Sequence, residues 1–403
     1  MKYQKVEIMF CLEPTPTDPI LGLTEEFRND PSTEKINLGV GVYQNENGET
    51  PILKSVKIAE KYLFESESTK AYFGIPGEPV LGRLTQELLL GKKHSIIENS
   101  LAQTAQTPGG TGALRIAAEF ISRARPKAHV WISNPSWANH QPILLGASLQ
   151  IKRYRYYDAE THSLDNSGML DDLSEANTGD VLILHGCCHN PAGVDLSSSD
   201  WENIADLASR KKLLCIVDFA YQGFGDGPIQ DRNGLLTLIK KNSDLLIANS
   251  FSKNFGLYRE RTGAITVISE TKKDSQAAFS HIKEIIRAIY SSPPSHGGAI
   301  VSTILGDEKL KSLWLRELDE MRQRISAMRS DFVRSLKEKC PNHDFSFIEK
   351  QKGMFSFCGL SSEQVDRLKD EFHIYMVRSG RVNIAGITPS NIGRLTDAIE
   401  TVL

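Results

Sequence analysis

The segment SFSKNFGLYRER, residues 250–261, follows a strand-like apolar run at 245–248 and carries a lysine, Lys253, among hydroxyl side chains. Lysine is an unusual choice near the end of a buried strand, whereas an amine there can form a Schiff base with an aldehyde cofactor. The hydroxyls and Arg261 then suit a phosphate group on the same cofactor. Because an isolated lysine is more often a surface residue, this hypothesis depends on what the rest of the chain supplies.

Length and composition limit the class of protein. At 403 residues the chain exceeds one ordinary hydrophobic core, so we expect two domains. Its 40% hydrophobic and 24% charged residues are typical of a soluble globular protein, and its net charge of −3 provides no basic field for nucleic acid. No apolar run reaches the roughly 18 residues that span a bilayer. We therefore predict neither a nucleic-acid nor a membrane partner.

The N-terminal segment and the cysteines predict a cytoplasmic protein. Residues 1–14 lack the hydrophobic region of a signal peptide and are poor in the Arg and Ser of a mitochondrial transit peptide. Six cysteines are too few for a disulfide scaffold, which favours a reducing compartment. Pro14, Pro16 and Pro19 predict an extended N-terminal arm rather than a folded element.

Short β-rich segments alternate with helical ones along much of the chain. We expect strands at 130–133, 151–154, 181–184, 213–217, 245–248 and 264–268, with helical segments such as Trp201–Lys211 between several of them. This alternation predicts a mostly parallel α/β sheet covered on both faces, with ligands at the carboxyl ends of the strands. After Gly306, apolar residues at a spacing of three to four from Leu310 to Leu336 predict one long helix that leads into a smaller α+β unit.

The segment QTPGGTGALR, residues 106–115, predicts a glycine-containing loop that opens into a helix. The free N–H groups and the dipole of a helix N-terminus suit a phosphate. A tight turn without a ligand explains the glycines equally well. The segment matches neither the dinucleotide-binding nor the nucleoside-triphosphate glycine motif, so both of those functions are disfavoured.

A carboxylate, Asp218, directly follows the apolar run 213–217. At the carboxyl end of a strand it could hydrogen-bond a pyridinium nitrogen and so let the ring withdraw electrons. Taken alone, the same residue could equally cap a helix or the end of the sheet. Tyr221, three residues later, could reach the phenolic oxygen of the ring or simply be a packed aromatic.

The segment HGCCHNPAG, residues 185–193, contains two histidines and two cysteines and therefore raises the question of zinc. We disfavour a metal site because no second ligand pair at zinc spacing occurs in the chain. A continuing strand would also send Cys187 and Cys188 to opposite faces. Asn190, followed by a turn, is the better candidate, and we predict no metal.

Three further residues are candidates for a planar ring or for carboxylates. Trp137, in NPSWANH at 134–140, could stack on a cofactor ring or be an ordinary buried aromatic. Arg381 and Arg287 could each form the two-pronged bond that a guanidinium makes with a carboxylate. Either arginine alone could equally be a surface residue.

Taken together, these segments resemble one family in order and near its spacing, from about Asp18 to Leu403. They are similar to the aspartate aminotransferases, the pyridoxal-phosphate enzymes of fold type I, and especially to the bacterial aspartate and aromatic amino acid members. The resemblance implies an α/β fold in which a large domain surrounds a mostly parallel seven-stranded sheet and a smaller domain is α+β. It also implies pyridoxal 5'-phosphate as cofactor, amino acids and 2-oxo acids as substrates, and a homodimer with active sites at the interface.

The resemblance assigns roles to the residues around the cofactor ring. Lys253 is then the Schiff-base lysine and the base of the proton shift, and Asp218 pairs with the ring nitrogen. Asn190 and Tyr221 hold the phenolic oxygen, while Trp137 stacks on the ring.

It assigns further residues to the phosphate and to the substrate. The phosphate-binding residues are Gly110, Thr111, Ser250, Ser252 and Arg261. Tyr72 resembles the tyrosine that reaches the phosphate of the neighbouring subunit. Arg381 and the backbone of Gly41 would hold the substrate α-carboxylate, and Arg287 of the neighbour the distal one.

The residues that distinguish aspartate enzymes from aromatic amino acid enzymes in this family give conflicting indications here. Ile289 and Ser292 stand where aspartate-selective relatives usually have Asn, whereas Val42, Thr50 and Thr111 are similar to the aspartate type. Because of Arg287, we expect transfer of an amino group from aspartate to 2-oxoglutarate by a ping-pong mechanism. An aromatic amino acid aminotransferase is the alternative, and a pyridoxal-phosphate lyase or decarboxylase is less favoured.

The expected domain organisation follows the same resemblance. Residues 1–17 are the N-terminal arm, 18–48 begin the small domain, and 49–312 form the large cofactor-binding domain. Residues 313–403 comprise the interdomain helix and the rest of the small domain.

Overall fold

The computed structural model describes residues 21–403. The predicted N-terminal arm at 1–17 lies outside the described residues, as do the first residues of the predicted segment 18–48. Among the described residues, no helix is long and apolar enough to cross a membrane.

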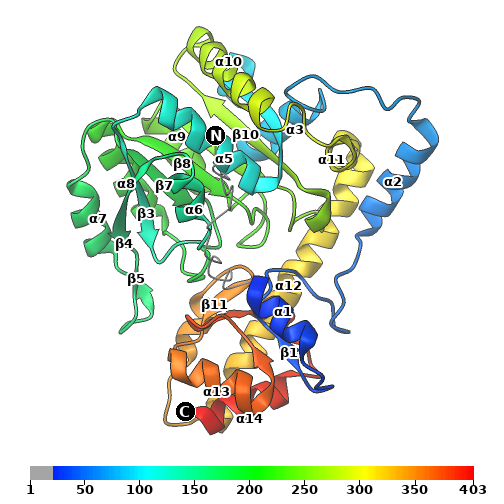
Figure 1. Cartoon of the computed structure of the whole chain (residues 1–403), viewed down its shortest axis with the longest axis vertical. Coiled ribbons are helices and arrows are strands. Elements are labelled where there is room, and N and C mark those ends of the chain that lie inside the picture. Colours follow the sequence, from blue (N-terminus) through cyan, green and yellow to red (C-terminus); the bar gives the residue numbers. More distant parts are fainter. Residues whose placement is uncertain (1–20) are drawn as a thin grey trace, which may run out of the picture.

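A seven-stranded sheet forms the centre of the larger part of the molecule (Figure 1). In spatial order its strands are β2 (Ala102–Pro108), β10 (Thr262–Ile268), β9 (Leu245–Ser250), β8 (Leu214–Phe219), β7 (Val181–His185), β3 (His129–Asn134) and β4 (Gln150–Arg155). All neighbours are parallel except β10, which is antiparallel to both β9 and β2. The predicted mostly parallel seven-stranded sheet is therefore confirmed, and the six predicted strand segments all lie in it.

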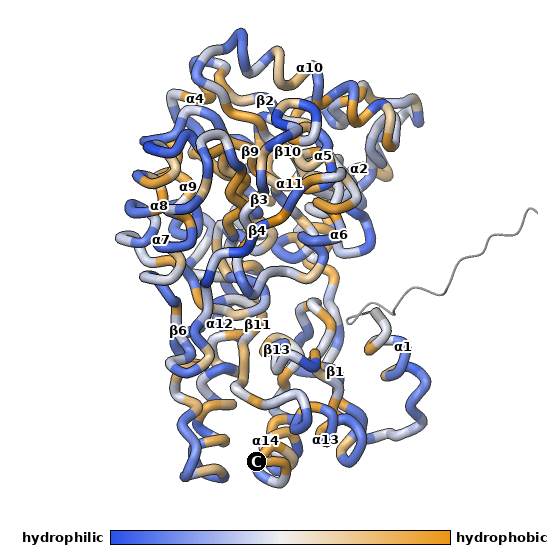
Figure 2. Tube along the Cα trace, turned by 60° about the vertical axis from the view of Figure 1, so that its left-hand side comes forward, coloured by the Kyte–Doolittle hydropathy of each residue, from blue (hydrophilic) through white to orange (hydrophobic). Residues whose placement is uncertain are grey.

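Both faces of the sheet are buried, because successive side chains on each strand enter different apolar clusters. On β8, Leu214 and Ile216 belong to the apolar cluster that includes residues of α5 (Gly109–Ala124) and α10 (Lys272–Ile289). Cys215 and Val217 belong to the cluster that includes residues of α8 (Ser198–Lys211) and α9 (Asn233–Lys241). This arrangement explains why the central strands are continuously apolar (Figure 2). The helices that cover the faces are α5 (Gly109–Ala124), α10 (Lys272–Ile289), α8 (Ser198–Lys211) and α9 (Asn233–Lys241).

Shorter elements complete the part of the chain around the sheet. The helices are α2 (Lys54–Ser66), α3 (Leu81–Leu90), α4 (Ser95–Glu98), α6 (His140–Leu145), α7 (Asn166–Ser174) and α11 (Ser295–Gly306). The strands β5 (Tyr157–Asp158) and β6 (Ser163–Leu164) form a small hairpin.

The predicted long helix is present as α12 (Glu308–Lys339). The Asp307 side chain caps its N-terminus by accepting hydrogen bonds from two backbone N–H groups. Trp314 on this helix donates its indole N–H to the Asn254 carbonyl at 2.7 Å, and its ring stacks on Phe255 at 4.4 Å. The helix therefore anchors the loop that carries Lys253.

The smaller part of the molecule assembles from both ends of the described chain around α12 (Figure 1). Strand β1 (Ile36–Asn37) pairs in parallel with β12 (Ile374–Tyr375), about 340 residues later. The other elements there are α1 (Leu21–Asn29), β11 (Phe355–Phe357), α13 (Ser362–Phe372), β13 (Arg381–Asn383) and α14 (Ile392–Val402). The exact domain limits stay a prediction.

Candidate active site

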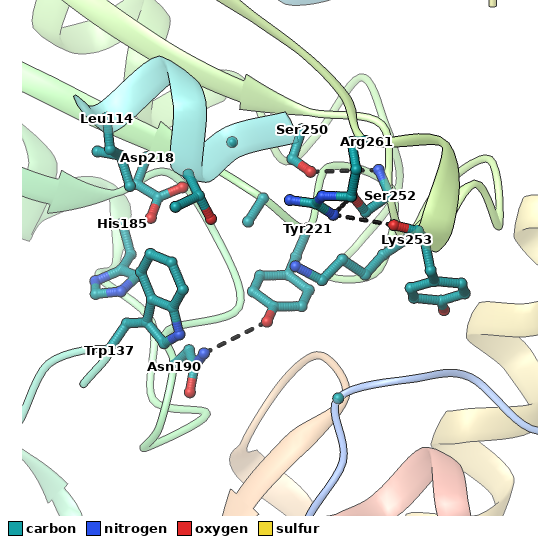
Figure 3. A pocket seen from close by; sticks show the side chains of 15 residues that line it. Leu114, Trp137, His185, Asn190, Asp218, Tyr221, Ser250, Ser252, Lys253 and Arg261 are labelled. Carbon is teal, nitrogen blue, oxygen red and sulfur yellow. Dashed lines mark hydrogen bonds between the residues drawn. The ribbon is translucent and has the colours of Figure 1, made fainter. Parts of the chain in front are cut away.

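The lysine loop begins where β9 ends at Ser250, at the carboxyl edge of the sheet. Phe251 and Phe255 are fully buried and meet edge to face at 5.5 Å, which holds the backbone on both sides of Lys253. The Lys253 amine lies 4.6 Å from the centre of the Tyr221 ring. The loop thus directs an amine into the cavity rather than toward bulk solvent (Figure 3).

The environment of Lys253 favours its neutral form. Burial lowers the pKa of the amine to about 8, the Asp218 carboxylate opposes this effect, and the cations Arg261 and Arg381 add to it. A larger fraction of this amine is therefore unprotonated near neutral pH than of an ordinary lysine.

Asp218 lies on β8 and is almost completely buried. Burial alone would raise the pKa of its carboxyl, but the hydrogen bond from His140 and the electrostatic effects of His140, His185 and Lys253 outweigh burial, so the net pKa is lowered. The His140 Nε2 atom lies 3.1 Å from Asp218 Oδ2, and His140 Nδ1 lies 2.8 Å from the Ser136 hydroxyl. The cavity therefore keeps a buried negative charge at this end.

A chain of hydrogen bonds connects the two sides of the cavity. The Asn190 amide donates to the Tyr221 hydroxyl at 3.4 Å and accepts from the Arg381 guanidinium at 3.1 Å. Arg381 also donates to the Gly39 carbonyl at 2.7 Å and lies 4.1 Å above the Phe355 ring. Burial lowers the Arg381 pKa to about 10, so the guanidinium stays charged at neutral pH.

The opposite end of the cavity is suited to an anion. Gly110 and Thr111 in the first turn of α5 line the cavity together with Ser250 and Ser252, and Gly110 packs against Ser250 at the end of β9. The Arg261 guanidinium donates to Ser252 at 3.5 Å and adds a positive charge (Figure 3). Hydroxyls, a guanidinium and a helix N-terminus are together the groups that bind a phosphate.

Gly109 shows why a glycine opens this helix. Its φ angle is +70°, and a Cβ there would lie 2.4 Å from an Arg261 nitrogen. Any other residue would displace the guanidinium that faces the helix N-terminus.

These side chains line one cavity of about 360 Å³ (Figure 3). The predicted residues that line it are Gly41, Gly110, Thr111, Trp137, Asn190, Asp218, Tyr221, Ser250, Ser252, Lys253 and Arg261. Arg381 is not among the lining residues and reaches the cavity through its bond to Asn190. The tertiary structure therefore brings together residues that lie more than 200 positions apart.

Besides Arg381, two predicted residues do not line this cavity. The Tyr72 side chain is 95% exposed, and Arg287 is exposed with its guanidinium bonded to the Ser291 hydroxyl. Both were expected to act in the neighbouring subunit, so their positions in a single chain do not test that role.

Sequence reasoning missed four residues that line the cavity: Leu114, His185, Ala220 and Tyr258. His185 is the last residue of β7, and Ala220 stands between Asp218 and Tyr221. Because His185 and Ala220 lie at the carboxyl ends of strands, their positions could have predicted that they line the site. Tyr258 accepts a hydrogen bond from the Tyr43 backbone at 2.9 Å, a contact that only the fold creates.

One argument used against a metal at 185–193 was wrong. It assumed that a strand continues through both cysteines, but β7 ends at His185. Cys188 instead has a φ angle of +52°, in the left-handed region, and its backbone N–H donates to Asp195 at 2.8 Å. Alternation along a strand therefore does not apply to Cys187 and Cys188.

The donor set of the cavity fits a phosphorylated pyridine aldehyde. Its end at Arg261 can bind the phosphate, and the buried carboxylate of Asp218 can accept a hydrogen bond from the ring N–H. Lys253, whose lowered pKa favours the free amine, can react with the aldehyde. The family model described as aminotransferase class I and II matches residues 33–399. The chain belongs to the class I and II aminotransferases.

Individual aminotransferases are similar to this chain over almost its whole length. It is 52% identical over 388 residues to an aspartate aminotransferase of Escherichia coli (strain K12), covering 96% of this chain and 98% of that one. It is 43% identical to an aromatic-amino-acid aminotransferase of Pseudomonas aeruginosa, with 96% and 97% covered. The structure of an aromatic-amino-acid aminotransferase from Burkholderia pseudomallei, covalently bound to pyridoxal phosphate, superposes with a TM-score of 0.96 at 43% identity, covering 98% of this chain and 99% of that one.

Proposed function

We propose that this aminotransferase uses pyridoxal 5'-phosphate to transfer the amino group of aspartate to 2-oxoglutarate, with oxaloacetate and glutamate as products. The observation that carries the proposal is the cavity in which a lysine of lowered pKa and a buried carboxylate lie beside an anion-binding helix N-terminus. The higher identity to the aspartate enzyme, 52% against 43% for the aromatic one, supports aspartate.

The residues of the cavity divide the binding of the cofactor among them. Gly110, Thr111, Ser250, Ser252 and Arg261 would hold the phosphate, together with Tyr72 of the neighbouring subunit. Asn190 and Tyr221 would hold the phenolic oxygen and Trp137 would cover the ring. When bound, pyridoxal phosphate supplies an aldehyde that takes up the amino group and a ring that withdraws electrons from the substrate α-carbon.

Lys253 and Asp218 have complementary tasks. Because the Lys253 pKa is about 8, its amine can accept a proton from the substrate α-carbon and return it to the adjacent position. Asp218 keeps its negative charge in a buried position and so holds a proton on the ring nitrogen. The network from His140 to Ser136 fixes the direction of this carboxylate.

The substrate would be oriented by two guanidinium groups. Arg381, already linked to Asn190 and the backbone of the smaller part, would bind the α-carboxylate together with the Gly41 backbone. Arg287 of the neighbouring subunit would bind the distal carboxylate. Two carboxylate-binding arginines favour an aminotransferase that acts on dicarboxylate substrates over a lyase or a decarboxylase.

An aromatic amino acid aminotransferase is the second candidate. It is favoured by Ile289 and Ser292, which replace the Asn of aspartate-selective relatives, and by the similarity to the Pseudomonas aeruginosa enzyme. Turnover of aspartate, phenylalanine and tyrosine should be compared with 2-oxoglutarate as the common acceptor. We expect the largest kcat/KM for aspartate, and a larger value for either aromatic substrate would reverse the assignment.

We also propose a homodimer in the cytoplasm. Apolar side chains on and after α2 are exposed in the single chain, for example Phe64 at 88% and Ile58 at 48%. The five cysteines in the described residues are free and buried, as suits a reducing compartment. We further propose the domain limits given above, with residues 18–48 and 313–403 in the small domain and residues 49–312 in the large domain.

Asp218→Ala should lower kcat more than it raises KM. Without the carboxylate, nothing in the cavity holds a proton on the ring nitrogen, so electron withdrawal weakens in the transition state. We expect kcat to fall at least about tenfold, which corresponds to about 1.4 kcal/mol. Steady-state kinetics at saturating cofactor test this, with Asp218→Glu as the charge-preserving control. A change in cofactor affinity alone would make Asp218 only a binding residue.

Uptake of the cofactor by the apoenzyme should depend on the protonation of Lys253. Only the free amine attacks an aldehyde, and burial lowers its pKa to about 8. Uptake should therefore accelerate as the pH rises and level off above about pH 8, whereas an ordinary lysine would require a pH above about 10.4. The rate of appearance of the yellow absorbance measures this, and a rise that continues to pH 10 would contradict the lowered pKa.

A further inference from the structure

Three side chains that can bind a metal meet at the wall of the cavity, where His185 and Asp218 line it. One ligand atom of each of His140, His185 and Asp218 lies within 4.8 Å of the other two. They come from the start of α6, the end of β7 and from β8, so no local sequence motif contains them. The sequence disfavoured zinc at 185–193 because it contains no second ligand pair at zinc spacing. The fold instead places His140 and Asp218 beside His185.

His140 already has the surroundings of a metal ligand. Its Nε2 atom faces Asp218 at 3.1 Å, and its Nδ1 atom faces the Ser136 hydroxyl at 2.8 Å. A metal-bound histidine normally donates its second N–H to an acceptor of this kind, which fixes the ring orientation. Coordination through Nε2 places the ring N–H on Nδ1, where the Ser136 hydroxyl can accept it.

His185 contributes a nitrogen that the fold leaves unused. Its Nε2 atom is buried and has no hydrogen-bond partner among the described residues, which is uncommon for a buried polar atom. Its ring centre lies 5.2 Å from that of His140.

We propose that the chain, when it lacks its cofactor, binds one zinc ion through His140, His185 and Asp218. Two imidazoles and a carboxylate form a known type of three-ligand zinc set, which leaves the fourth tetrahedral position to a water molecule. The open cavity beside these residues provides room for that water. Zinc binding does not depend on the proposed function.

A consequence rests on the proposed function. Asp218 cannot serve zinc and the ring nitrogen of pyridoxal phosphate at the same time, so the two ligands exclude one another. Zinc would then delay the loading of newly made chains and would leave the loaded enzyme unaffected.

The test uses the full-length chain after removal of the cofactor and of metal by a chelator. Titration calorimetry with Zn²⁺ should give one ion per chain, and Co²⁺ should produce a visible absorption band as a spectroscopic substitute. His185→Gln and Asp218→Asn should each weaken zinc binding at least about tenfold, the lower end of the effect of an outer-sphere partner. His343→Gln, which changes an exposed histidine in the smaller part of the molecule, should bind zinc like the unaltered chain.

Ser136→Ala provides a variant that removes no ligand and disturbs the fold least. It should weaken zinc binding by about 10- to 100-fold, because His140 loses the acceptor for its second N–H. Pyridoxal phosphate added to the zinc-loaded chain should release the ion, and the holoenzyme should take up none at this site.

Lack of one-to-one zinc binding, or unchanged affinity in His185→Gln and Ser136→Ala, would overturn the metal site. Equal zinc binding by apoenzyme and holoenzyme would overturn its location. Transaminase activity of the holoenzyme is a separate readout, so an inactive protein that still binds zinc in this way would contradict only the proposed function.

Discussion

Lys253→Ala should retain the cofactor non-covalently and lose transamination, with kcat lower by at least about a hundredfold and as much as about ten-thousandfold, the range that a general base contributes. The amine that carries the proton between two positions is then absent, while the phosphate-binding residues and Asp218 are unchanged. Borohydride should link the cofactor permanently to the unaltered chain and should not link it to the variant, which lacks the amine. Absorbance spectra before and after borohydride, with steady-state kinetics, check both parts.

The matched control is Lys350→Ala, which removes an exposed lysine from the smaller part of the molecule. Its absorbance and turnover should equal those of the unaltered chain. Near-normal turnover in Lys253→Ala would contradict the role of Lys253 as the Schiff-base lysine and general base, because no other lysine lines the cavity in the described part of the chain.

Arg287→Leu should lower kcat/KM for aspartate by at least about thirtyfold and change that for phenylalanine little or favourably. Loss of one partner from a buried charge pair costs about 2–5 kcal/mol, and about 1.4 kcal/mol corresponds to tenfold. An apolar side chain gains nothing from a desolvated guanidinium, so phenylalanine does not lose this interaction. The ratio of the two kcat/KM values is the measurement.

Arg381→Leu is the control for this substitution, since both substrates carry an α-carboxylate and both should be impaired. Hybrid dimers test whether Arg287 acts across the interface. A dimer of one Arg287→Leu chain and one Lys253→Ala chain contains one site with both native residues, so mixing two inactive proteins should restore activity. Equal losses for aspartate and phenylalanine, or hybrids without activity, would count against the placement of Arg287.

The sheet was predictable where its strands are buried on both faces. Segments such as 213–217 and 245–248 are continuously apolar because helices cover both sides of the sheet. Strand β2, Ala102–Pro108, was missed as a strand because it lies at the edge of the sheet and is mostly polar. Its Thr104 bonds across to Thr266 at 2.8 Å, a pairing that the sequence does not reveal.

The candidate site was predictable to the extent that each functional residue follows a strand. Lys253, Asp218 and Asn190 stand after apolar runs, and parallel strands bring their carboxyl ends to one edge. Gly41 and Arg381 have no such signal, because they reach the site from the part of the chain around β1 and β13. Only the resemblance to a family suggested Gly41 and gave Arg381 its place at the α-carboxylate. The packing of these two residues against Phe355 and Asn190 depends on the fold.

Hydrophobic periodicity and residue chemistry along short segments are sufficient to predict the α/β architecture, the long helix α12 and the lysine loop. The surroundings of Asp218, in contrast, depend on how distant segments pack together. His140 and His185 are 45 positions apart and are ordinary histidines in the sequence, yet strand order places both beside one carboxylate. The lowered pKa of Lys253 likewise comes from burial and from charges brought from distant segments, which no local pattern contains.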